Sequence, residues 1–308
     1  MLSPLLLAAA RSRRMRSLVT AVPVTRGVVD RFVAGEDLDA ALRAAGELTG
    51  DGLAVTLDHL GEDTTDRAQA ERTRDAYLAL FAAFAEHGLT RDADASVKLS
   101  ALGRALPGDG EAVALDLARE IAAAADRHGM TVTLDMEDHT TVDSTLDALA
   151  KLRADFPSTG VAIQAMLRRT EGDLKDLAHD GSRVRLVKGA YAEPASVAFQ
   201  SRREVDRAYV RDLRLLMEGG GHPMIGSHDP RIIDIALDLA RRTGRAPESY
   251  EFQMLYGIRA SEQRRLAGSG QRMRVYVPYG SDWYGYFMRR LAERPANLAF
   301  FLRSFVSR

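Results

Sequence analysis

The chain of 308 residues contains no cysteine, which excludes disulfide bonds, thiol nucleophiles and thiolate metal ligands. It also lacks an excess of either charge, because 42 Lys and Arg residues oppose 43 Asp and Glu residues. The resulting formal net charge of −1 argues against nucleic acid as the main partner. No low-complexity tract or proline-rich linker marks a domain boundary. These absences indicate a globular protein. Because a chain without cysteine has no disulfide to preserve, a reducing compartment is permitted, and we expect the protein in the cytoplasm.

The N-terminus lacks the features of a membrane span or a secretory signal. Its apolar run ends at Arg11, which makes it far too short to cross a bilayer. A secretory signal carries its positive charge before the apolar run, whereas here the charge follows. We therefore predict that residues 1–50 form an N-terminal helical segment packed on the body of the protein, with residues 17–50 helical. The alternative is a helix lying on a membrane surface.

Several catalytic signatures are also missing. No G-x-G-x-x-G motif follows a predicted strand, and the glycine run 219–221 precedes a strand, where a phosphate loop does not belong. The absence of H-x-H and H-E-x-x-H spacing argues against a metal site. No G-x-S-x-G occurs, and the neighbours Ser227, His228 and Asp229 cannot form a triad with one another. A hydrolase and a metalloenzyme are thus disfavoured.

Strand-like and helix-like segments alternate along the rest of the chain. Eight β-rich runs are followed by helical segments, the rhythm of an α/β protein of the (β/α)8 TIM-barrel class over residues 51–308. A doubly wound open sheet is the alternative fold. The predicted strands are Leu53–Leu60, Ser96–Ser100, Met130–Met136, Val161–Met166, Arg183–Lys188, Pro223–Ser227, Tyr250–Met254 and Met273–Val277. The predicted helices are Thr65–His87, Glu111–His128, Thr141–Phe156, Glu171–Ala178, Ala195–Met217, Pro230–Arg242, Ala260–Ala267 and one that starts at Asp282.

Polar residues gather where these strands end. Active sites of such barrels lie at the carboxyl ends of the strands, so these side chains are expected to share one site. Lys98 could instead be neutralised by Asp135, Arg185 could form a structural ion pair, and His228 could be a hydrogen-bonded core residue. The residues concerned are Asp58, His59, Glu62, Lys98, Asp135, Glu137, Asp138, His139, Gln164, Arg185, Lys188, Tyr191, Ser227, His228, Asp229, Gln253, Leu255 and Tyr276.

The last predicted helix carries a second concentration of charge. Tyr286, Arg289, Arg290 and Glu293 are spaced three and four residues apart, which places them on adjoining helix faces. Two neighbouring guanidinium groups repel unless an anion lies between them, and a small carboxylate accepts paired N–H donors from such forks. A solvated helix with internal ion pairs is the alternative, but the many aromatic residues between positions 276 and 287 argue against a solvated face.

Six segments in order resemble the proline dehydrogenases of the monofunctional, FAD-dependent bacterial type: V-K-L-S, L-D-M-E, V-R-L-V-K-G-A-Y, S-H-D, F-Q-M-L-Y-G and Y-F-M-R-R-L-A-E-R-P-A-N. The resemblance implies a distorted barrel, FAD over the strand ends and a final helix lying over the substrate site. It implies oxidation of L-proline to 1-pyrroline-5-carboxylate by hydride transfer to FAD, the first step of proline catabolism to glutamate. It further implies a quinone-type electron acceptor, reached by peripheral contact at the inner face of the cell membrane.

The resemblance also assigns roles to individual residues. Asp135, Arg185 and Tyr276 would be catalytic, with Arg185 near the flavin N5 and Asp135 beside Lys98. The substrate would bind through Lys98, Leu255, Tyr286, Arg289, Arg290 and Glu293. FAD would bind through Met136, Gln164, Arg185, Lys188, Gly189, Ala190, Ser227, His228 and Gln253. The concentration of positive charge would lower the pKa of the bound ammonium, so that the neutral amine gives up hydride.

Two departures bear on these assignments. Many bifunctional family members have Trp after K-G-A-Y, where this chain has Ala192, so stacking on the flavin would differ. Arg185 and Lys188 have opposite parity on a regular strand, so a bend after Val187 is needed to bring both to one ligand. Two other functions stay open: a Schiff-base lyase or aldolase that uses Lys98 or Lys188 as nucleophile, and a non-catalytic amino-acid-binding protein.

Overall fold

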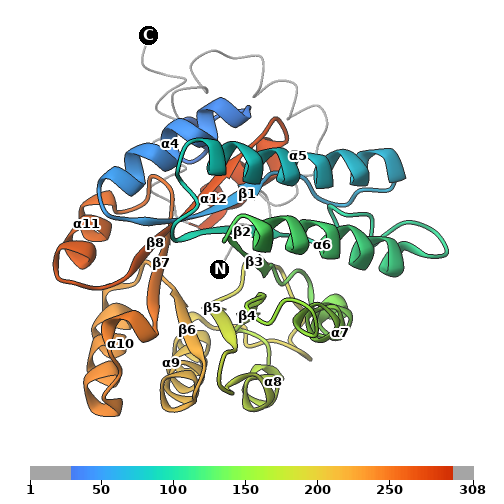
Figure 1. Cartoon of the computed structure of the whole chain (residues 1–308). Helices are drawn as coiled ribbons and strands as arrows, with labels where there is room; N and C mark the ends of the chain where they lie inside the picture. The colour runs from blue at the N-terminus through green and yellow to red at the C-terminus, as the bar shows by residue number, and fades with distance from the viewer. Residues whose placement is uncertain (1–28, 294–308) are drawn as a thin grey trace, which may run out of the picture.

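The structure is a computed structural model that describes residues 29–293, with the side chains of residues 29–290. Its eight described strands form a closed barrel in which every neighbour is parallel, from β1 round to β8 and back (Figure 1). The predicted (β/α)8 barrel is therefore confirmed. The strands are β1 Ala54–His59, β2 Ala93–Val97, β3 Thr131–Leu134, β4 Gly160–Gln164, β5 Arg183–Val187, β6 His222–Gly226, β7 Glu251–Leu255 and β8 Met273–Tyr279.

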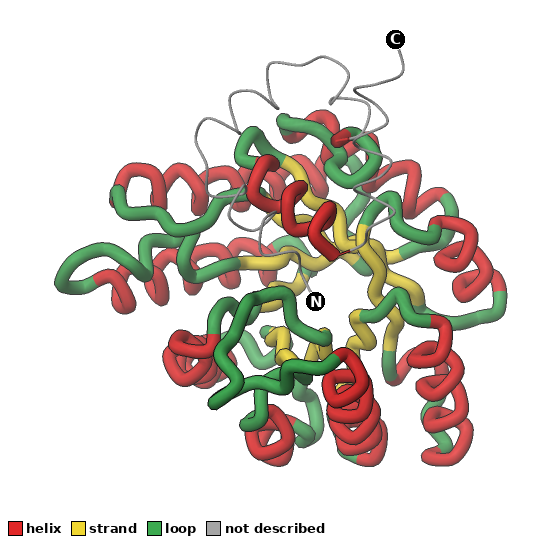
Figure 2. The backbone as a smooth tube through the Cα atoms, turned by 180° about the vertical axis from the view of Figure 1, so that it is seen from behind, coloured by secondary structure: helices red, strands yellow, loops and turns green. Residues whose placement is uncertain are grey.

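The helices surround the ring of strands, as the view from behind shows (Figure 2). Helix α4 packs against β1 and β8, and α12 begins four residues after β8 ends. The helices are α4 Leu38–Gly50, α5 Arg67–Glu86, α6 Gly110–Arg127, α7 Val142–Arg153, α8 Thr170–Leu177, α9 Arg202–Glu218, α10 Pro230–Thr243, α11 Ala260–Gly268 and α12 Trp283–Glu293. Two short 3₁₀ helices, η1 His139–Thr141 and η2 Pro247–Ser249, precede α7 and β7.

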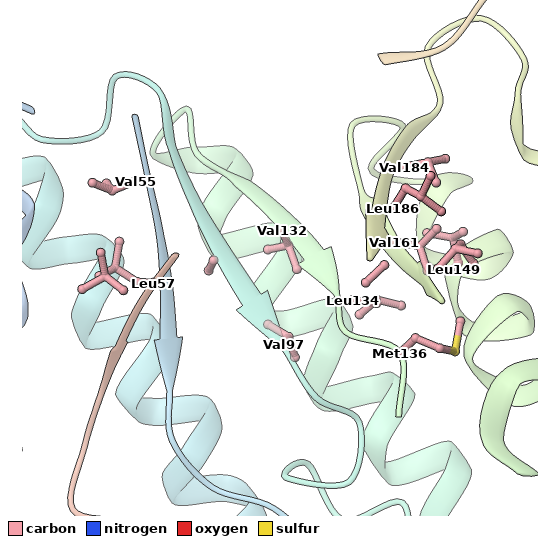
Figure 3. Close-up of a cluster of buried hydrophobic side chains, with 14 of the residues drawn as sticks. Val55, Leu57, Val97, Val132, Leu134, Met136, Leu149, Val161, Val184 and Leu186 are labelled. Atoms are coloured by element: carbon pink, nitrogen blue, oxygen red, sulfur yellow. The ribbon is translucent and has the colours of Figure 1, made fainter. Parts of the chain in front are cut away.

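The outer face of the strands forms the apolar core. Valine and leucine side chains from β1 to β5 gather with Leu149 of α7 in one buried cluster (Figure 3). Alternate residues of the same strands point the other way, into the barrel. There Thr56, Asp94 and Thr131 lie at the same level of β1, β2 and β3. Barrel interiors are usually filled by branched apolar side chains, so this interior is unusually polar.

The segment before α4 and helix α12 cover one side of the barrel. Ala34 donates its N–H to the Pro278 carbonyl at 2.9 Å, and Gly280 donates to the Gly35 carbonyl at 2.9 Å. The rings of Phe32 and Phe287 are tilted by 50° with centroids 6.3 Å apart, in a buried cluster formed with Val29, Val33, Leu60 and residues of α12. These contacts join α12 to the barrel at the end where the strands finish.

Several predicted boundaries differ from the structure. The predicted helix 17–50 is not continuous in the described part: residues 30–37 are not helical, and α4 begins at Leu38, where Asp37 caps it by accepting the Ala40 N–H; residues 1–28 lie outside the described residues. The second strand begins at Ala93 rather than Ser96, since its polar, inward-facing residues concealed its start. Helix α9 starts at Arg202, not Ala195, because Ser201 and Glu204 form a capping box.

Candidate active site

A cavity of about 1330 Å³ opens at the carboxyl ends of the strands. Its wall includes every residue to which the family resemblance assigned a role and whose side chain the structure describes; the side chain of Glu293 lies outside that part. Four strand-end residues that were expected at the same site do not lie on its wall: His59, Glu137, Asp138 and His139. The predicted residues on the wall are Lys98, Asp135, Met136, Gln164, Arg185, Lys188, Gly189, Ala190, Ser227, His228, Gln253, Leu255, Tyr276, Tyr286, Arg289 and Arg290. The sequence thus identified which residues meet, and their roles are considered below.

The floor of the cavity is a buried network of charges. Lys98 Nζ donates to Asp58 Oδ1 at 2.7 Å and lies 3.4 Å from Asp135 Oδ2. Arg185 Nη1 donates to Asp135 Oδ1 at 2.7 Å. The Tyr276 hydroxyl donates to Asp135 Oδ2 at 2.8 Å, and the Arg185 guanidinium carbon lies 5.3 Å from the centre of the Tyr276 ring. Asp135 therefore joins three strands, β2, β5 and β8, at one point.

These contacts decide which groups carry charge. Burial alone would lower the pKa of Lys98, but Asp58 and Asp135 outweigh it and hold that pKa well above its usual value. Burial would raise the pKa of Asp135, yet the positive charges of Lys98 and Arg185 lower it below its usual value. Burial raises the pKa of Tyr276. The floor at neutral pH therefore holds a protonated lysine, an ionised aspartate and a neutral tyrosine.

The opposite side of the cavity is formed by α12. Both guanidinium ends of Arg289 donate to the Glu62 carboxylate, one of them at 2.8 Å. The Arg290 guanidinium lies over the Tyr286 ring, 5.1 Å from its centre. Glu62 is thus a partner of Arg289 that the sequence did not suggest, while the expected contact of Glu293 with the arginines lies outside the described side chains. Tyr191 is close enough to Glu62 for that charge, after burial, to raise the tyrosine pKa.

The bend that the sequence required after Val187 is present. Strand β5 ends at Val187, and Gly189 has a φ of +109°, which side-chain-bearing residues rarely adopt. A Cβ at Gly189 would lie 2.4 Å from Met166 Sδ, so only glycine fits. The turn brings Lys188 to the cavity wall, where its Nζ pairs with Asp206 at 2.5 Å and with a second carboxylate. Arg185 and Lys188 thus reach the same cavity.

Two amide side chains and one imidazole complete the wall between β3 and β7. Gln164 Nε2 donates to the backbone carbonyl of Glu137 at 3.0 Å, and its buried Oε1 has no hydrogen-bond partner among the described residues. His228 Nε2 accepts the Leu255 N–H at 2.9 Å, which fixes the ring. Gln253 Nε2 donates to a carboxylate deeper in the barrel at 2.6 Å. Gln164 lines the cavity, so its acceptor without a partner is suited to a donor on a bound ligand.

The sequence led us to expect unpaired positive charge at the site, and this is wrong for four of the predicted cations. Each of them has a carboxylate partner within 2.8 Å, so the cavity does not present a simple cationic surface. It follows that these cations alone do not lower the pKa of a bound ammonium. The pairs are Lys98 with Asp58, Arg185 with Asp135, Lys188 with Asp206, and Arg289 with Glu62.

The wall residues that received no role from the sequence include Asp58, Glu62 and Tyr191. Asp58 lies near the end of β1 and Glu62 follows it in L-D-H-L-G-E, and Tyr191 completes K-G-A-Y. Their position at strand ends was a signal, but their partners were not. Glu62 and Arg289 are separated by 227 residues, and no local pattern links residues so far apart.

Two features are absent from the described residues. In residues 29–293, no group of three or more His, Cys, Asp or Glu side chains is arranged to hold a metal ion. None of the helices searched in that range is both long enough and apolar enough to cross a membrane.

Comparison with known proteins places the chain in a family. Residues 41–303 match the sequence profile of the proline dehydrogenase family. The chain is 39% identical over 284 residues to proline dehydrogenase 1 of Bacillus subtilis subsp. natto, with 92% of each chain covered. It is 41% identical over 275 residues to proline dehydrogenase of Deinococcus radiodurans, covering 89% of this chain and 88% of the relative.

A solved structure shows the same architecture. Proline utilization A from Bdellovibrio bacteriovorus, inactivated by N-propargylglycine, superposes with a TM-score of 0.80 at 26% identity. The match covers 87% of this chain and 33% of that one, so the present chain spans about a third of the larger protein. The profile match over most of the sequence and the two full-length relatives agree with the barrel and its cavity: this chain belongs to the proline dehydrogenase family.

Proposed function

We propose that this protein oxidises L-proline to 1-pyrroline-5-carboxylate with FAD as cofactor, the first step of proline catabolism to glutamate. One observation carries the proposal beyond family membership. Lys98 on the floor and Arg289 and Arg290 on α12 line the same cavity, which has room for a flavin beside a small carboxylate. Lys98 and Arg289 also lie close enough for each to interact with the other's carboxylate partner. Burial has the largest effect on both pKa values; among the smaller effects, Glu62 raises the pKa of Lys98 and Asp58 raises that of Arg289.

The proline carboxylate would lie between Lys98, Arg289 and Arg290. A guanidinium has five N–H donors, so Arg289 can keep Glu62 and still donate to a second carboxylate. Charge-assisted hydrogen bonds of this kind are short and directional, and they would fix the orientation of the ring. Tyr276, Tyr286 and Leu255 would contact the pyrrolidine ring, and Glu293 would support the arginines.

The cavity suits FAD by its size and by its donors and acceptors. Gln164 Oε1 is a buried acceptor without a partner among the described residues, as a flavin ring N–H requires. Lys188 lies on the cavity wall, and its third ammonium proton, besides those donated to Asp206 and Asp229, would be available to a phosphate oxygen. The remaining cofactor contacts would come from Met136, Arg185, Ala190, Ser227, His228 and Gln253.

FAD, when bound, would accept the two electrons and the hydrogen that leave Cδ of proline, the ring CH₂ carbon bonded to nitrogen. The protein positions the reacting groups and sets the charge around them. Arg185, held by Asp135, would lie at the flavin N5 and stabilise negative charge there. Tyr276 and Asp135 hold each other in place at the floor, so the ring of the substrate meets a rigid surface.

We also propose that the electrons pass on to a quinone-type acceptor. Such an acceptor resides in a membrane, so the protein would act in the cytoplasm with peripheral contact at the inner face of the cell membrane. The support for this step is the family resemblance alone. Mixing the proline-reduced protein with a soluble quinone analogue should reoxidise the flavin; a flavin that stays reduced would exclude a quinone acceptor.

A Schiff-base lyase is disfavoured by the geometry. Such an enzyme needs a neutral lysine amine, and Asp58 and Asp135 hold Lys98 in its protonated form. Lys188 is likewise paired with two carboxylates. A non-catalytic amino-acid-binding protein would use the same anion site, so only a measurement of turnover separates it from the enzyme.

The test is reduction of the flavin by substrate. The purified protein should be yellow, and L-proline added without oxygen should bleach the flavin absorbance. A colourless protein that cannot be reconstituted with FAD would contradict the proposal. Proline binding without bleaching would favour a binding protein. Borohydride trapping of a carbonyl substrate on Lys98 or Lys188 would favour the lyase.

A further inference from the structure

A buried carboxylate lies beneath the cavity floor, inside the barrel. Asp94 of β2 is fully buried and is not part of the cavity wall. Its oxygens accept hydrogen bonds from three threonine hydroxyls: Thr56 at 3.0 Å, Thr131 at 2.9 Å and Thr133 at 2.9 Å. These three donors are neutral, so they hold the carboxylate in place, while its charge is offset by cations: Arg185 donates to it, and its charge, set against burial, acts to raise the pKa of Arg183 and Arg274.

The cation that approaches Asp94 is Arg185. Its Nη2 lies 3.3 Å from Asp94 Oδ2, while its Nη1 donates at 2.7 Å to both Ser96 Oγ and Asp135 Oδ1. Ser96 in turn donates to Asp135 at 2.7 Å. The Arg185 guanidinium thus donates to Asp94 on the barrel side and to Asp135 on the cavity side. Its plane cannot rotate without breaking one of these contacts.

The charge count at this place is uneven. Two cations, Lys98 and Arg185, are in contact with three carboxylates, those of Asp58, Asp94 and Asp135. Asp94 is the one of the three that does not line the cavity. Its hydrogen-bonded link to the cavity wall is Arg185, which it can hold in position and whose positive charge it offsets.

We propose that Asp94 is a positioning residue of the proline-oxidising site, which holds Arg185 against the flavin and offsets part of its charge. The inference rests on the proposed function, in which Arg185 lies at the flavin N5. The reduced flavin would carry a net negative charge on its ring, and a cation whose charge is partly offset stabilises that charge less than a free one. Asp94 thereby keeps the bound flavin a weaker oxidant than Arg185 alone would make it.

The experiment compares two variants that differ in charge. Asp94→Asn removes the negative charge and keeps the size and much of the hydrogen bonding of the side chain. Thr56→Val removes one hydrogen bond to Asp94 and keeps the charge. The reduction potential of the bound FAD is measured against a reference dye, together with the thermal stability of each variant.

We expect Asp94→Asn to shift the ratio of reduced to oxidised flavin about tenfold toward the reduced form, which is about 30 mV for a two-electron couple. Thr56→Val should leave the potential at the wild-type value while it lowers stability. The KM for L-proline should change little in Asp94→Asn, because Asp94 does not line the cavity. A residue with a purely structural role would lower stability and leave the potential unchanged.

The outcomes separate this inference from the proposed function. If the wild-type protein binds no FAD or is not bleached by L-proline, the proposed function fails. If the wild-type protein is bleached and Asp94→Asn has the wild-type potential, the role of Asp94 is overturned and the function stands. Should Asp94→Asn not fold, Asp94→Ser removes the same charge and leaves space for a water among the threonine hydroxyls. It must then show the same rise in potential.

Discussion

The barrel interior holds two layers of buried charge that differ in how completely they are paired. The lower layer, formed by Glu251, Arg272 and Arg274 at the amino ends of β7 and β8, is closed. Glu251 accepts from Arg274 Nε at 2.7 Å, from Arg272 Nε at 3.0 Å and from Gln253. Arg274 Nη1 donates to two backbone carbonyls, those of Val55 and another residue, at 2.7 Å each.

The upper layer, formed by Lys98, Asp135 and Arg185, is left open toward the cavity. Arg185 Nε is buried without a hydrogen-bond partner among the described residues, and so is the second oxygen of Asp58. Charged groups of the same kinds thus serve two purposes. The lower layer satisfies its own donors and acceptors and stabilises the barrel, whereas the upper layer keeps bonding capacity for a ligand.

The largest effect is expected from breaking the lower layer. Arg274→Met leaves Glu251 as a buried charge with fewer partners, which typically costs about 3–5 kcal/mol of unfolding free energy. Urea unfolding followed by circular dichroism measures this loss. Arg241→Met, at an exposed arginine of α10, is the matched control and should change stability by less than about 0.5 kcal/mol. A loss below about 1 kcal/mol in Arg274→Met would show that the lower layer does not stabilise the barrel.

A substitution beside the upper layer should weaken substrate binding more than it lowers the free energy of unfolding. Arg289→Met and Arg290→Met each remove a charge-assisted contact to the proline carboxylate, worth about 1.5–3 kcal/mol. We expect proline affinity to fall by roughly one to two decades, with FAD still bound in Arg289→Met. Steady-state kinetics with a dye acceptor and the flavin absorbance measure the two quantities. An unchanged KM in both variants would contradict the carboxylate assignment, and Arg241→Met again serves as the control.

The smallest effect concerns a carboxyl group outside both layers. Burial raises the pKa of Asp212 on α9 to about 7, well above its ordinary value near 4. The folded protein therefore holds a proton that the unfolded chain releases, and stability falls as pH rises from about 4 to about 7. Asp212→Asn should remove this dependence and raise the unfolding free energy by roughly 1–3 kcal/mol at pH 8.

The two forms should be equally stable near pH 4, where Asp212 is protonated in the folded protein. Urea titrations at pH 4 and pH 8 make the comparison. A wild-type advantage at pH 8 would mean that the Asp212 carboxylate is stabilised in the folded protein, contrary to its burial.

The sequence predicted the upper layer better than the lower one. Polar residues at the ends of apolar strands, such as Lys98 and Asp135, stand out because the (β/α)8 rhythm places strand ends together. Polar residues inside strands, such as Asp94 and Ser96, weakened the strand pattern and shifted the predicted start of β2. A buried charge resembles a loop residue until its partner on another strand is known.

Pairing across the fold was the part that the sequence could not supply. Glu62 and Arg289 lie 227 residues apart, and Glu251 receives a hydrogen bond from Arg274 on the neighbouring strand. Local spacing can suggest only pairs within one helix, because residues three and four apart face each other there. Contacts made by the closure of the barrel join residues far apart in the chain, and only the assembled fold shows them.

A crystal structure of the FAD-loaded protein, reduced with dithionite and soaked with L-proline, tests the central claim most directly, because a reduced flavin cannot oxidise the substrate. We predict the proline carboxylate at about 2.7–3.2 Å from Lys98 Nζ and from the Arg289 guanidinium, with the ring against the flavin. A carboxylate bound elsewhere, with Arg289 turned into solvent away from Lys98, would contradict the account.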